Sequence, residues 1–246
     1  MTGPVLVTGA SRGIGRAVAQ ALAAAGHDLV LWSRSAGELA GLAEQVAAHG
    51  VAARVASVDV GDADQVAAAA HATLDPTAGL GGVVLNAGGG RWSPLPEIEL
   101  ADWRNTIATN LDGAFHTLRA ALPLLTARPG GLLVGLLSDS VLHPFPGRAA
   151  YSAAKSGMRA LLEVARRELR PHGVRVSLLL PSRVDTYFQG AHDEARPGTR
   201  ADALSAEQVA DVVTYLFGLP VAVELREVQL AAMTTTFGPF PERVCP

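Results

Sequence analysis

Cysteine, aromatic residues and long apolar runs are all scarce in this chain of 246 residues. Its one cysteine, Cys245, cannot form an internal disulfide, so we expect a reducing compartment. Aromatic residues make up 5% of the sequence, which leaves alanine, valine and leucine to build the core. No stretch approaches the ~20 uncharged apolar residues that span a bilayer, and we find no charged leader before an apolar segment. We therefore expect a cytoplasmic protein with no membrane partner.

Neither sign of charge dominates, and metal-binding patterns are missing. The sequence has 20 Lys+Arg against 23 Asp+Glu, a net charge of -3, and contains no basic run. A nucleic-acid partner is therefore not expected. His143 has no cysteine, histidine or acid at the spacing of metal ligands, so we predict no catalytic metal.

Short apolar runs alternate with alanine-rich segments of helical period, a pattern typical of βα units that build a parallel sheet. We expect one domain over residues 1–246 with an α/β Rossmann-type fold, in which helices cover both faces of a doubly wound, seven-stranded parallel sheet. A region without clear period, 185–204, is expected to form a substrate loop. The predicted strands are 4–8, 28–33, 53–58, 82–86, 131–137, 174–180 and 227–231, and the predicted helices are 13–25, 36–49, 62–74, 101–125, 149–170 and 205–217.

A glycine-rich segment, Thr8-Gly9-Ala10-Ser11-Arg12-Gly13-Ile14-Gly15, lies between the first predicted strand and the first predicted helix. Glycines at such a turn allow a diphosphate to approach the backbone, and the helix N-terminus supplies unpaired N–H donors. The segment therefore predicts a dinucleotide site.

Tyr151 and Lys155 are four residues apart near the start of a predicted helix, so their side chains share one face. A neighbouring ammonium favours the phenolate, so we expect Lys155 to lower the pKa of Tyr151. Ser138 ends the fifth predicted strand, at the edge where parallel sheets place their ligands. Its hydroxyl would polarise a substrate carbonyl while Tyr151 gives or takes the proton. Ser140 is the competing choice for that hydroxyl.

These segments together resemble the short-chain dehydrogenase/reductase family. The glycine turn matches T-G-x-x-x-G-x-G, and Tyr151 to Lys155 matches Y-x-x-x-K. The resemblance runs from Val5 to about Ala231. It implies that Ser138 is the catalytic serine and that Asn110 is the fourth catalytic residue, holding a water that links Lys155 to solvent. Further segments with family counterparts are Asp59-Val60, Asn86-Ala87-Gly88, and the stretch from Trp103 through Asn110 to Pro123.

The resemblance also assigns a cofactor site. Lys155 would bind the ribose, and Pro181-Ser182-Arg183-Val184-Asp185-Thr186 stands where the family has P-G-x-V-x-T. Ser182 replaces a glycine there, which puts the contacts through that turn in doubt. The expected cofactor-binding residues are Gly9, Ser11, Arg12, Gly13, Ile14, Gly15, Ser33, Arg34, Asp59, Val60, Asn86, Ala87, Gly88, Tyr151, Lys155, Pro181, Ser182, Val184 and Thr186.

The second predicted strand indicates which dinucleotide binds. A carboxylate at its end would favour NAD, but the strand ends at Ser33 and is followed by Arg34. Arg34 and Arg12 together suit the extra phosphate of NADP. We therefore expect NADP(H) as the cofactor.

The activity expected from these features is hydride transfer between NADP(H) and a small carbonyl or alcohol substrate, such as a ketone, aldehyde or 3-oxoacyl compound. A partly aromatic substrate pocket would be formed by Trp92, His143, Phe145, Tyr187 and Phe188. Two alternatives remain: a catalytically silent NADP-binding sensor, and an epimerase or dehydratase of the same fold.

The predicted helices that begin at residues 101 and 149 also bear on assembly. They carry more apolar surface than one sheet face needs, notably at Met158, Leu161, Leu162 and Ala165. This excess indicates a homo-oligomer, either a dimer or a tetramer.

Overall fold

Seven parallel strands form one sheet in the order β3-β2-β1-β4-β5-β6-β7. The computed structural model describes residues 3–187 and 197–235. All seven strands predicted from the sequence are present, each within a few residues of its expected bounds. They are β1 (Val5–Thr8), β2 (Leu29–Ser33), β3 (Ala53–Ser57), β4 (Gly82–Leu85), β5 (Leu132–Leu136), β6 (Arg175–Pro181) and β7 (Glu227–Leu230).

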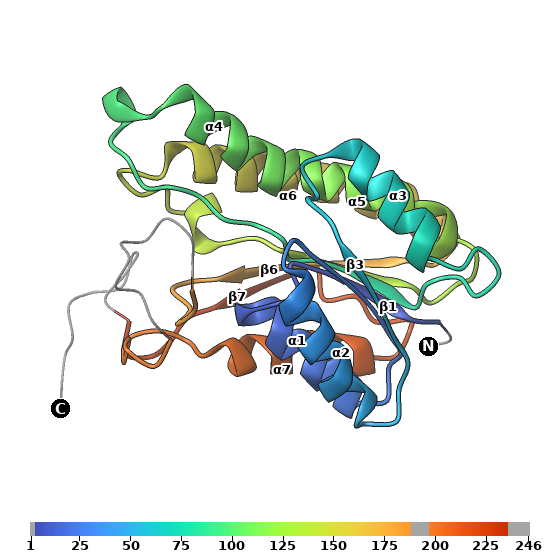
Figure 1. The fold of residues 1–246 in the computed structure, drawn as a ribbon. Coiled ribbons are helices and arrows are strands. Elements are labelled where there is room, and N and C mark those ends of the chain that lie inside the picture. The colour runs from blue at the N-terminus through green and yellow to red at the C-terminus, as the bar shows by residue number, and fades with distance from the viewer. Residues whose placement is uncertain (1–2, 188–196, 236–246) are drawn as a thin grey trace.

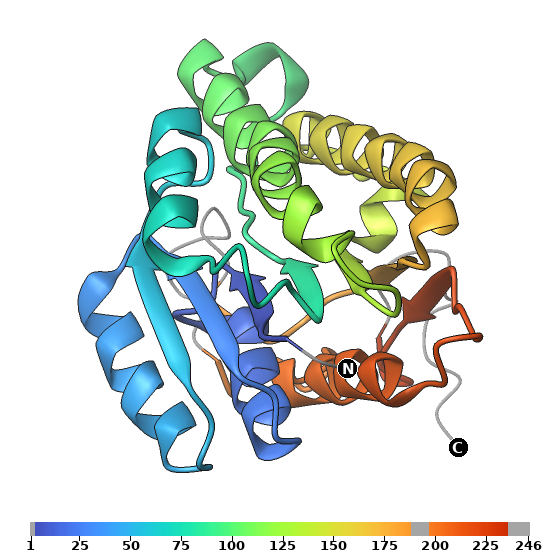
Figure 2. The ribbon, with the colours of Figure 1, turned by 90° about the vertical axis from the view of Figure 1, so that its right-hand side faces the viewer.

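Helices cover both faces of the sheet, as expected for a doubly wound fold. Figure 1 shows α1, α2 and α7 below the sheet and α3 to α6 above it, and the turned view in Figure 2 keeps these three layers. The helices are α1 (Gly13–Ala24), α2 (Ala36–Ala47), α3 (Ala63–Thr73), α4 (Leu100–Ile107), α5 (Gly113–Leu125), α6 (Ala149–Leu169) and α7 (Ala206–Gly218). Short helical turns are η1 (Leu95–Glu97), η2 (Ala108–Asp112), η3 (Asp139–Val141) and η4 (Arg170–His172).

The sheet divides the core into two apolar clusters, because successive side chains of a strand point to opposite faces. In β1, Val5 and Val7 pack toward α1, α2 and α7, whereas Leu6 packs toward α3, α5 and α6. Trp32 of β2 is fully buried and donates from Nε1 to Thr73 Oγ1 at 3.0 Å. Strands β1, β4, β5 and β6 are buried along their whole length or nearly so, which explains their continuous apolar sequence.

The prediction of one continuous helix over residues 101–125 is wrong. The structure divides it into α4, the π-helical turn η2 and α5. Asn110 lies in η2, where its Nδ2 donates to Thr106 O at 2.8 Å and to Gly89 O at 2.6 Å. A contact with a distant loop therefore fixes the break, and helical periodicity along the sequence carries no sign of it.

Three of the four apolar residues of α6 that we expected at a subunit interface belong instead to the core, whereas Leu161 is partly exposed. Met158 and Leu162 are 1% and 0% exposed, and Ala165 is also buried. These side chains pack against the sheet, so they are not surplus apolar surface. Exposed apolar side chains occur elsewhere, at Trp103 and Phe115, and self-association stays a prediction. Among the described residues, none of the helices combines the length and the apolar composition needed to cross a bilayer.

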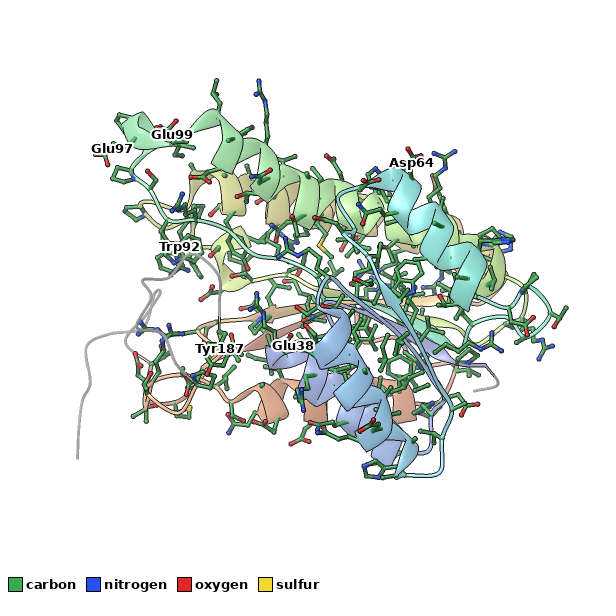
Figure 3. All side chains as sticks on the ribbon, in the orientation of Figure 1. Glu38, Asp64, Trp92, Glu97, Glu99 and Tyr187 are labelled. Carbon is green, nitrogen blue, oxygen red and sulfur yellow. The ribbon has the colours of Figure 1, made fainter. Side chains whose placement is uncertain are left out.

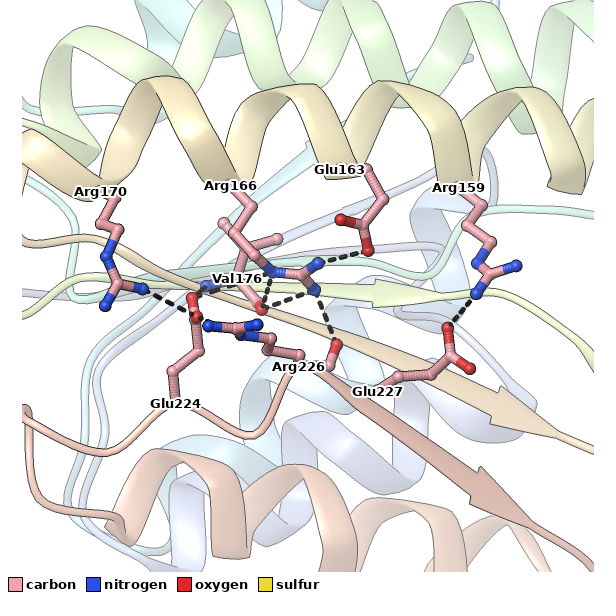
Figure 4. A network of polar contacts seen from close by, with 8 residues as sticks. All are labelled: Arg159, Glu163, Arg166, Arg170, Val176, Glu224, Arg226 and Glu227. Atoms are coloured by element: carbon pink, nitrogen blue, oxygen red, sulfur yellow. Dashed lines mark hydrogen bonds and ion pairs between the residues drawn. The ribbon is translucent and has the colours of Figure 1, made fainter.

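A buried arginine joins α6 to β6 and to the residue that precedes the edge strand β7 (Figure 4). Arg166 donates to the backbone carbonyls of Val176 and Arg226, at 3.1 and 2.7 Å, and also contacts Glu163. The carboxylate of Glu224 lies 4.0 Å from Arg166 Nε and accepts a hydrogen bond from the Val176 N–H at 3.0 Å. The charge of Arg166 is therefore compensated and its donors are used, as a buried guanidinium requires.

We expect Arg166→Leu to lower the free energy of unfolding by about 2–4 kcal/mol, because two carbonyls lose their donor and Glu224 loses a cation. Urea denaturation measures the change. Arg167→Leu is the matched control, since Arg167 is the next residue of α6 and is exposed, and its effect should stay within about 0.5 kcal/mol. Equal losses in the two variants would contradict this role for Arg166.

Candidate active site

A cleft lies at the carboxyl ends of the strands, beside the point where β1 neighbours both β2 and β4. Parallel sheets place their ligands at this switch point. Most residues predicted to bind the cofactor meet there. The cleft is lined by Gly9, Ser11, Arg12, Gly13, Ile14, Ser33, Arg34, Ser35, Val58, Asp59, Val60, Asn86, Ala87, Gly88, Thr109, Leu136, Leu137, Tyr151, Lys155, Pro181, Thr186 and Tyr187.

The glycine turn forms one wall of the cleft, and its glycines are needed for different physical reasons. Gly9 and Gly13 have φ of 64° and 52°, in the left-handed region that side chains disfavour. Gly15 does not line the cleft but packs on the turn itself, since a Cβ there would lie 2.2 Å from Gly9 O. Asn86 Nδ2 donates to Thr8 O at 2.9 Å and to Gly9 O at 3.2 Å. The end of β4 thus holds the turn in place.

The end of β2 lies against the same turn. Ser33 Oγ donates to Ser11 Oγ at 2.8 Å, which joins the second strand to the glycine turn. Arg34 is 56% exposed in its side chain, and its Nη1 lies 3.9 Å from Asp59 Oδ2. Such an exposed pair is weak, so it restrains Arg34 little. Arg12, the N-cap residue of α1, also lines the cleft.

The predicted catalytic residues come together at the end of the cleft that Tyr151 and Lys155 line, which we call its inner end; Ser138 and Asn110 lie next to these two residues but do not line the cleft. Tyr151 and Lys155 are 7% and 3% exposed, and Lys155 Nζ lies 5.8 Å from the centre of the Tyr151 ring. Lys155 Nζ donates to Leu136 O at 2.8 Å. Ser138 lies two residues beyond β5 rather than at its last position, caps η3, and forms a side-chain hydrogen bond with Tyr151. Ser140 is fully buried beneath it and contacts Ser138 Oγ at 3.2 Å.

Burial controls the ionisation of this pair. It raises the pKa of Tyr151 to about 12 and lowers the pKa of Lys155 to about 8. We had expected Lys155 to lower the pKa of Tyr151, but the groups that oppose burial there are Ser138, through its hydrogen bond, and Arg148, through its charge. The phenol therefore carries its proton at neutral pH.

Asn110 lies beside Lys155 although the two come from different helical segments. A Cβ at Gly88 would lie 2.6 Å from Asn110 Oδ1 and 3.2 Å from Lys155 Nζ. Both side chains thus border the same glycine. Asn110 is fully buried, and its Oδ1 accepts a hydrogen bond from the Gly89 N–H at 3.3 Å. The prediction that it holds a water for Lys155 stays a prediction.

Besides Gly15, two residues predicted to contact the cofactor, Ser182 and Val184, do not line the cleft. Val184 forms a bridge to Leu204, while Pro181 and Thr186 on either side do line the cleft. Ser182 replaces a glycine of the family, and a glycine could have a positive φ there, but within the described residues only glycines have a positive φ. Serine therefore fits this turn without backbone strain. The Ser182 N–H donates to Leu230 O at 2.7 Å.

The sequence reasoning missed two charged residues beside Ser138 and Tyr151. Asp139 follows Ser138 directly, and its Oδ1 accepts from Ser138 Oγ at 3.1 Å. Arg148, three residues before Tyr151, stacks on Trp92 with its guanidinium 4.2 Å from the ring centre. Trp92 in turn packs edge-on against Tyr151, with ring centres 5.5 Å apart. The adjacency of Asp139 to Ser138 was the available signal.

The aromatic pocket predicted for the substrate is described in part. Figure 3 labels Trp92 and Tyr187 on the same side of the molecule, where β4 and β6 end. Phe145 lies beneath the Arg148 guanidinium, 5.1 Å from it. Phe188 falls outside the described residues, as does Cys245. Across the part of the chain that the structure describes, no group of three His, Cys, Asp or Glu residues is placed to hold a metal ion.

This arrangement joins a phosphate-compatible glycine turn to a protonated phenol, a serine hydroxyl and an amine. It can bind a long anionic ligand and pass a proton to an oxygen atom at its inner end.

Comparison with known proteins agrees with that chemistry. The family profile described as short chain dehydrogenase matches residues 4–197. A 3-oxoacyl-[acyl-carrier-protein] reductase of Aggregatibacter actinomycetemcomitans is 34% identical over 234 residues, 93% of this chain and 97% of that protein. An alcohol dehydrogenase of Thermococcus sibiricus, solved with 5-hydroxy-NADP, is 33% identical with a TM-score of 0.89, covering 96% of this chain and 98% of that one.

A metagenomic short-chain oxidoreductase, solved with NADP, is 32% identical with a TM-score of 0.80 and covers 93% and 96% of the two chains. The protein belongs to the short-chain dehydrogenase family. The resemblance seen in the sequence and the predicted fold are thereby confirmed.

Lys155 is also the only lysine in the 246 residues, a signal that the sequence reasoning did not use. Its ammonium can therefore be observed alone, with lysine labelled by ¹³C at Cε. We expect one NMR resonance that titrates with a midpoint of about 8, because burial disfavours the charged amine. A midpoint at the ordinary value of 10.5 would show that Lys155 is solvated and would contradict its placement. Lys155→Arg removes the resonance and confirms its assignment.

Proposed function

We propose that the protein is an NADP(H)-dependent oxidoreductase that interconverts a carbonyl group and an alcohol. The observation that carries this proposal is the hydrogen-bonded pair of Tyr151 and Ser138, with Lys155 beside it, at the inner end of the cleft that the glycine turn lines. Family membership supports it, as do the relatives solved with NADP and its analogue.

The residues of the cleft fit a dinucleotide. The N-terminus of α1 offers N–H groups and a positive dipole to a diphosphate, and Gly9 and Gly13 leave the backbone open to it. At the inner end, a side chain at position 88 would collide with Asn110 and Lys155, and Gly88 leaves that space open. When bound, the nicotinamide supplies or accepts the hydride.

The side chains of the protein would handle the proton and the charge. In reduction, Tyr151 donates its proton to the substrate oxygen, a task that suits a phenol that stays protonated at neutral pH. Ser138 donates a hydrogen bond to that oxygen as negative charge develops on it. The Lys155 ammonium stabilises the phenolate that remains, and Asn110, beside Lys155, borders the route by which the proton returns.

Replacing Tyr151 by phenylalanine tests the acid–base role. We expect turnover to fall by about 10²–10⁴-fold, because no other group replaces the phenolic proton. Loss of NADPH absorbance with ketone, aldehyde, sugar and 3-oxoacyl panels measures turnover. The affinity for NADPH should change by less than about twofold, since the ring remains. An active Tyr151→Phe enzyme would refute the assignment, and cofactor binding without turnover in the unaltered protein would favour the sensor alternative.

The choice of NADP over NAD rests on Arg34 and Arg12, which line the cleft next to the joined Ser11 and Ser33. No carboxylate ends β2, where an NAD-binding chain has its ribose acceptor. Two guanidiniums at this position suit a phosphate monoester.

We expect Arg34→Leu to lower kcat/KM for NADPH by about 10- to 100-fold and to leave the value for NADH within about threefold. Arg54→Leu is a closely matched control. The Arg54 side chain is 55% exposed and lies 3.8 Å from Asp75, against 56% and 3.9 Å for Arg34. Arg54 does not line the cleft, so its removal should leave both values unchanged. A preference for NADH in the unaltered enzyme would overturn the assignment of the cofactor.

A further inference from the structure

The proposed mechanism leaves one acidic side chain of the site unused. Asp139 follows the catalytic serine, is partly buried, and accepts a hydrogen bond from Ser138 Oγ at 3.1 Å. Its second oxygen, Oδ2, is buried and has no hydrogen-bond partner within the described residues. A carboxylate held this close to the reacting groups must affect them, because its charge is poorly screened there.

The hydroxyl of Ser138 has a single proton, and besides Tyr151, which also forms a hydrogen bond with it, two neighbouring acceptors compete for that proton. Asp139 Oδ1 lies at 3.1 Å and Ser140 Oγ at 3.2 Å, while the Ser140 N–H donates to Ser138 Oγ at 3.2 Å. An ionised carboxylate is a stronger acceptor than a hydroxyl. When Asp139 is ionised, the Ser138 proton therefore points to it.

A substrate carbonyl oxygen needs that same proton, because it is an acceptor only. The need grows in the transition state, when the oxygen gains negative charge. An ionised Asp139 also repels that charge.

Taking the proposed function as given, we propose that Asp139 is a positioning residue that controls the Ser138 proton. Ionised Asp139 withholds the proton from the substrate oxygen and slows carbonyl reduction, whereas protonated Asp139 releases it.

The groups around Asp139 set the pH at which this control operates. Burial raises the pKa of Asp139, opposed by its hydrogen bond with Ser138 and by the charges of Arg148, at the start of α6, and His143, on the loop after η3. Tyr151 faces it from α6, and Arg183, beyond β6, faces Arg148. As the pH rises through the raised pKa of Asp139, the carboxyl ionises, and the rate of reduction should fall.

The test is Asp139→Asn, assayed for carbonyl reduction with NADPH across the acid and neutral range. Above the pKa of Asp139 we expect kcat to rise by roughly three- to tenfold, with KM nearly unchanged, because a neutral amide is the weaker acceptor. The fall in kcat with rising pH should vanish in the variant. Asp139→Ala should behave in the same way, which covers the case in which the asparagine variant folds poorly.

Ser138→Ala isolates the mechanism, because that enzyme has no hydroxyl proton to withhold. In this background, adding Asp139→Asn should raise the residual kcat much less than it does when Ser138 is present, because only the repulsion between Asp139 and the developing charge is then removed. An equal increase with and without Ser138 would show a purely electrostatic effect and would overturn the positioning role.

Asp102→Asn is the control: Asp102 lies on α4, pairs with Arg91 and does not contact Ser138, so its replacement should leave the pH profile as it is. An active enzyme in which Asp139→Asn leaves kcat and its pH profile unaltered, or lowers kcat, would overturn the inference alone. Failure of the unaltered enzyme to reduce any carbonyl compound would overturn the proposed function as well.

Discussion

The close contact between the first turn of α1 and the end of β1 is the constraint on which the site depends. A single added carbon at Gly15 would lie 2.2 Å from Gly9 O, so the helix must start directly against the strand. Asn86, beyond β4, binds the carbonyls of Thr8 and Gly9 and holds the turn from the other side. These contacts occur where the strand order reverses, and they aim the α1 N-terminus at the cleft.

Burial is the second constraint, and it acts at the inner end of the cleft. The chain places its only lysine and a tyrosine there, and loss of solvent shifts both toward their neutral forms. The partly buried carboxyl of Asp139 is also shifted toward its neutral form. The site therefore holds three groups whose charges are costly, next to one serine hydroxyl that two of them contact. Such a concentration of shifted pKa values is typical of catalysis.

Much of the fold and of the site was predictable from the sequence. The apolar runs predict the seven strands. The spacing of Gly9, Gly13 and Gly15 predicts that other groups approach the backbone closely at these positions. What escaped prediction depends on tertiary contacts. The break at Asn110 arises because its side chain binds the distant Gly89. The apolar face of α6 was assigned to an interface because periodicity does not tell which neighbour covers a face, and Met158 in fact contributes to the core.

The pKa of Tyr151 shows the same limit. A lysine four residues away on a helix predicts a lowered pKa for Tyr151 only if both side chains are in contact with solvent. Desolvation in the folded chain outweighs the neighbouring charges, and only the packing around the ring reveals it. The influence of Arg148 likewise depends on its position over Trp92, which no spacing in the sequence encodes.

The most direct test of the central claim is a crystal structure of the protein with NADP⁺ and an alcohol or carbonyl ligand. The account predicts the nicotinamide ring at the inner end of the cleft, with the ligand oxygen within hydrogen-bonding distance of both Tyr151 Oη and Ser138 Oγ. A dinucleotide bound elsewhere, or a ligand oxygen out of reach of both hydroxyls, would contradict it.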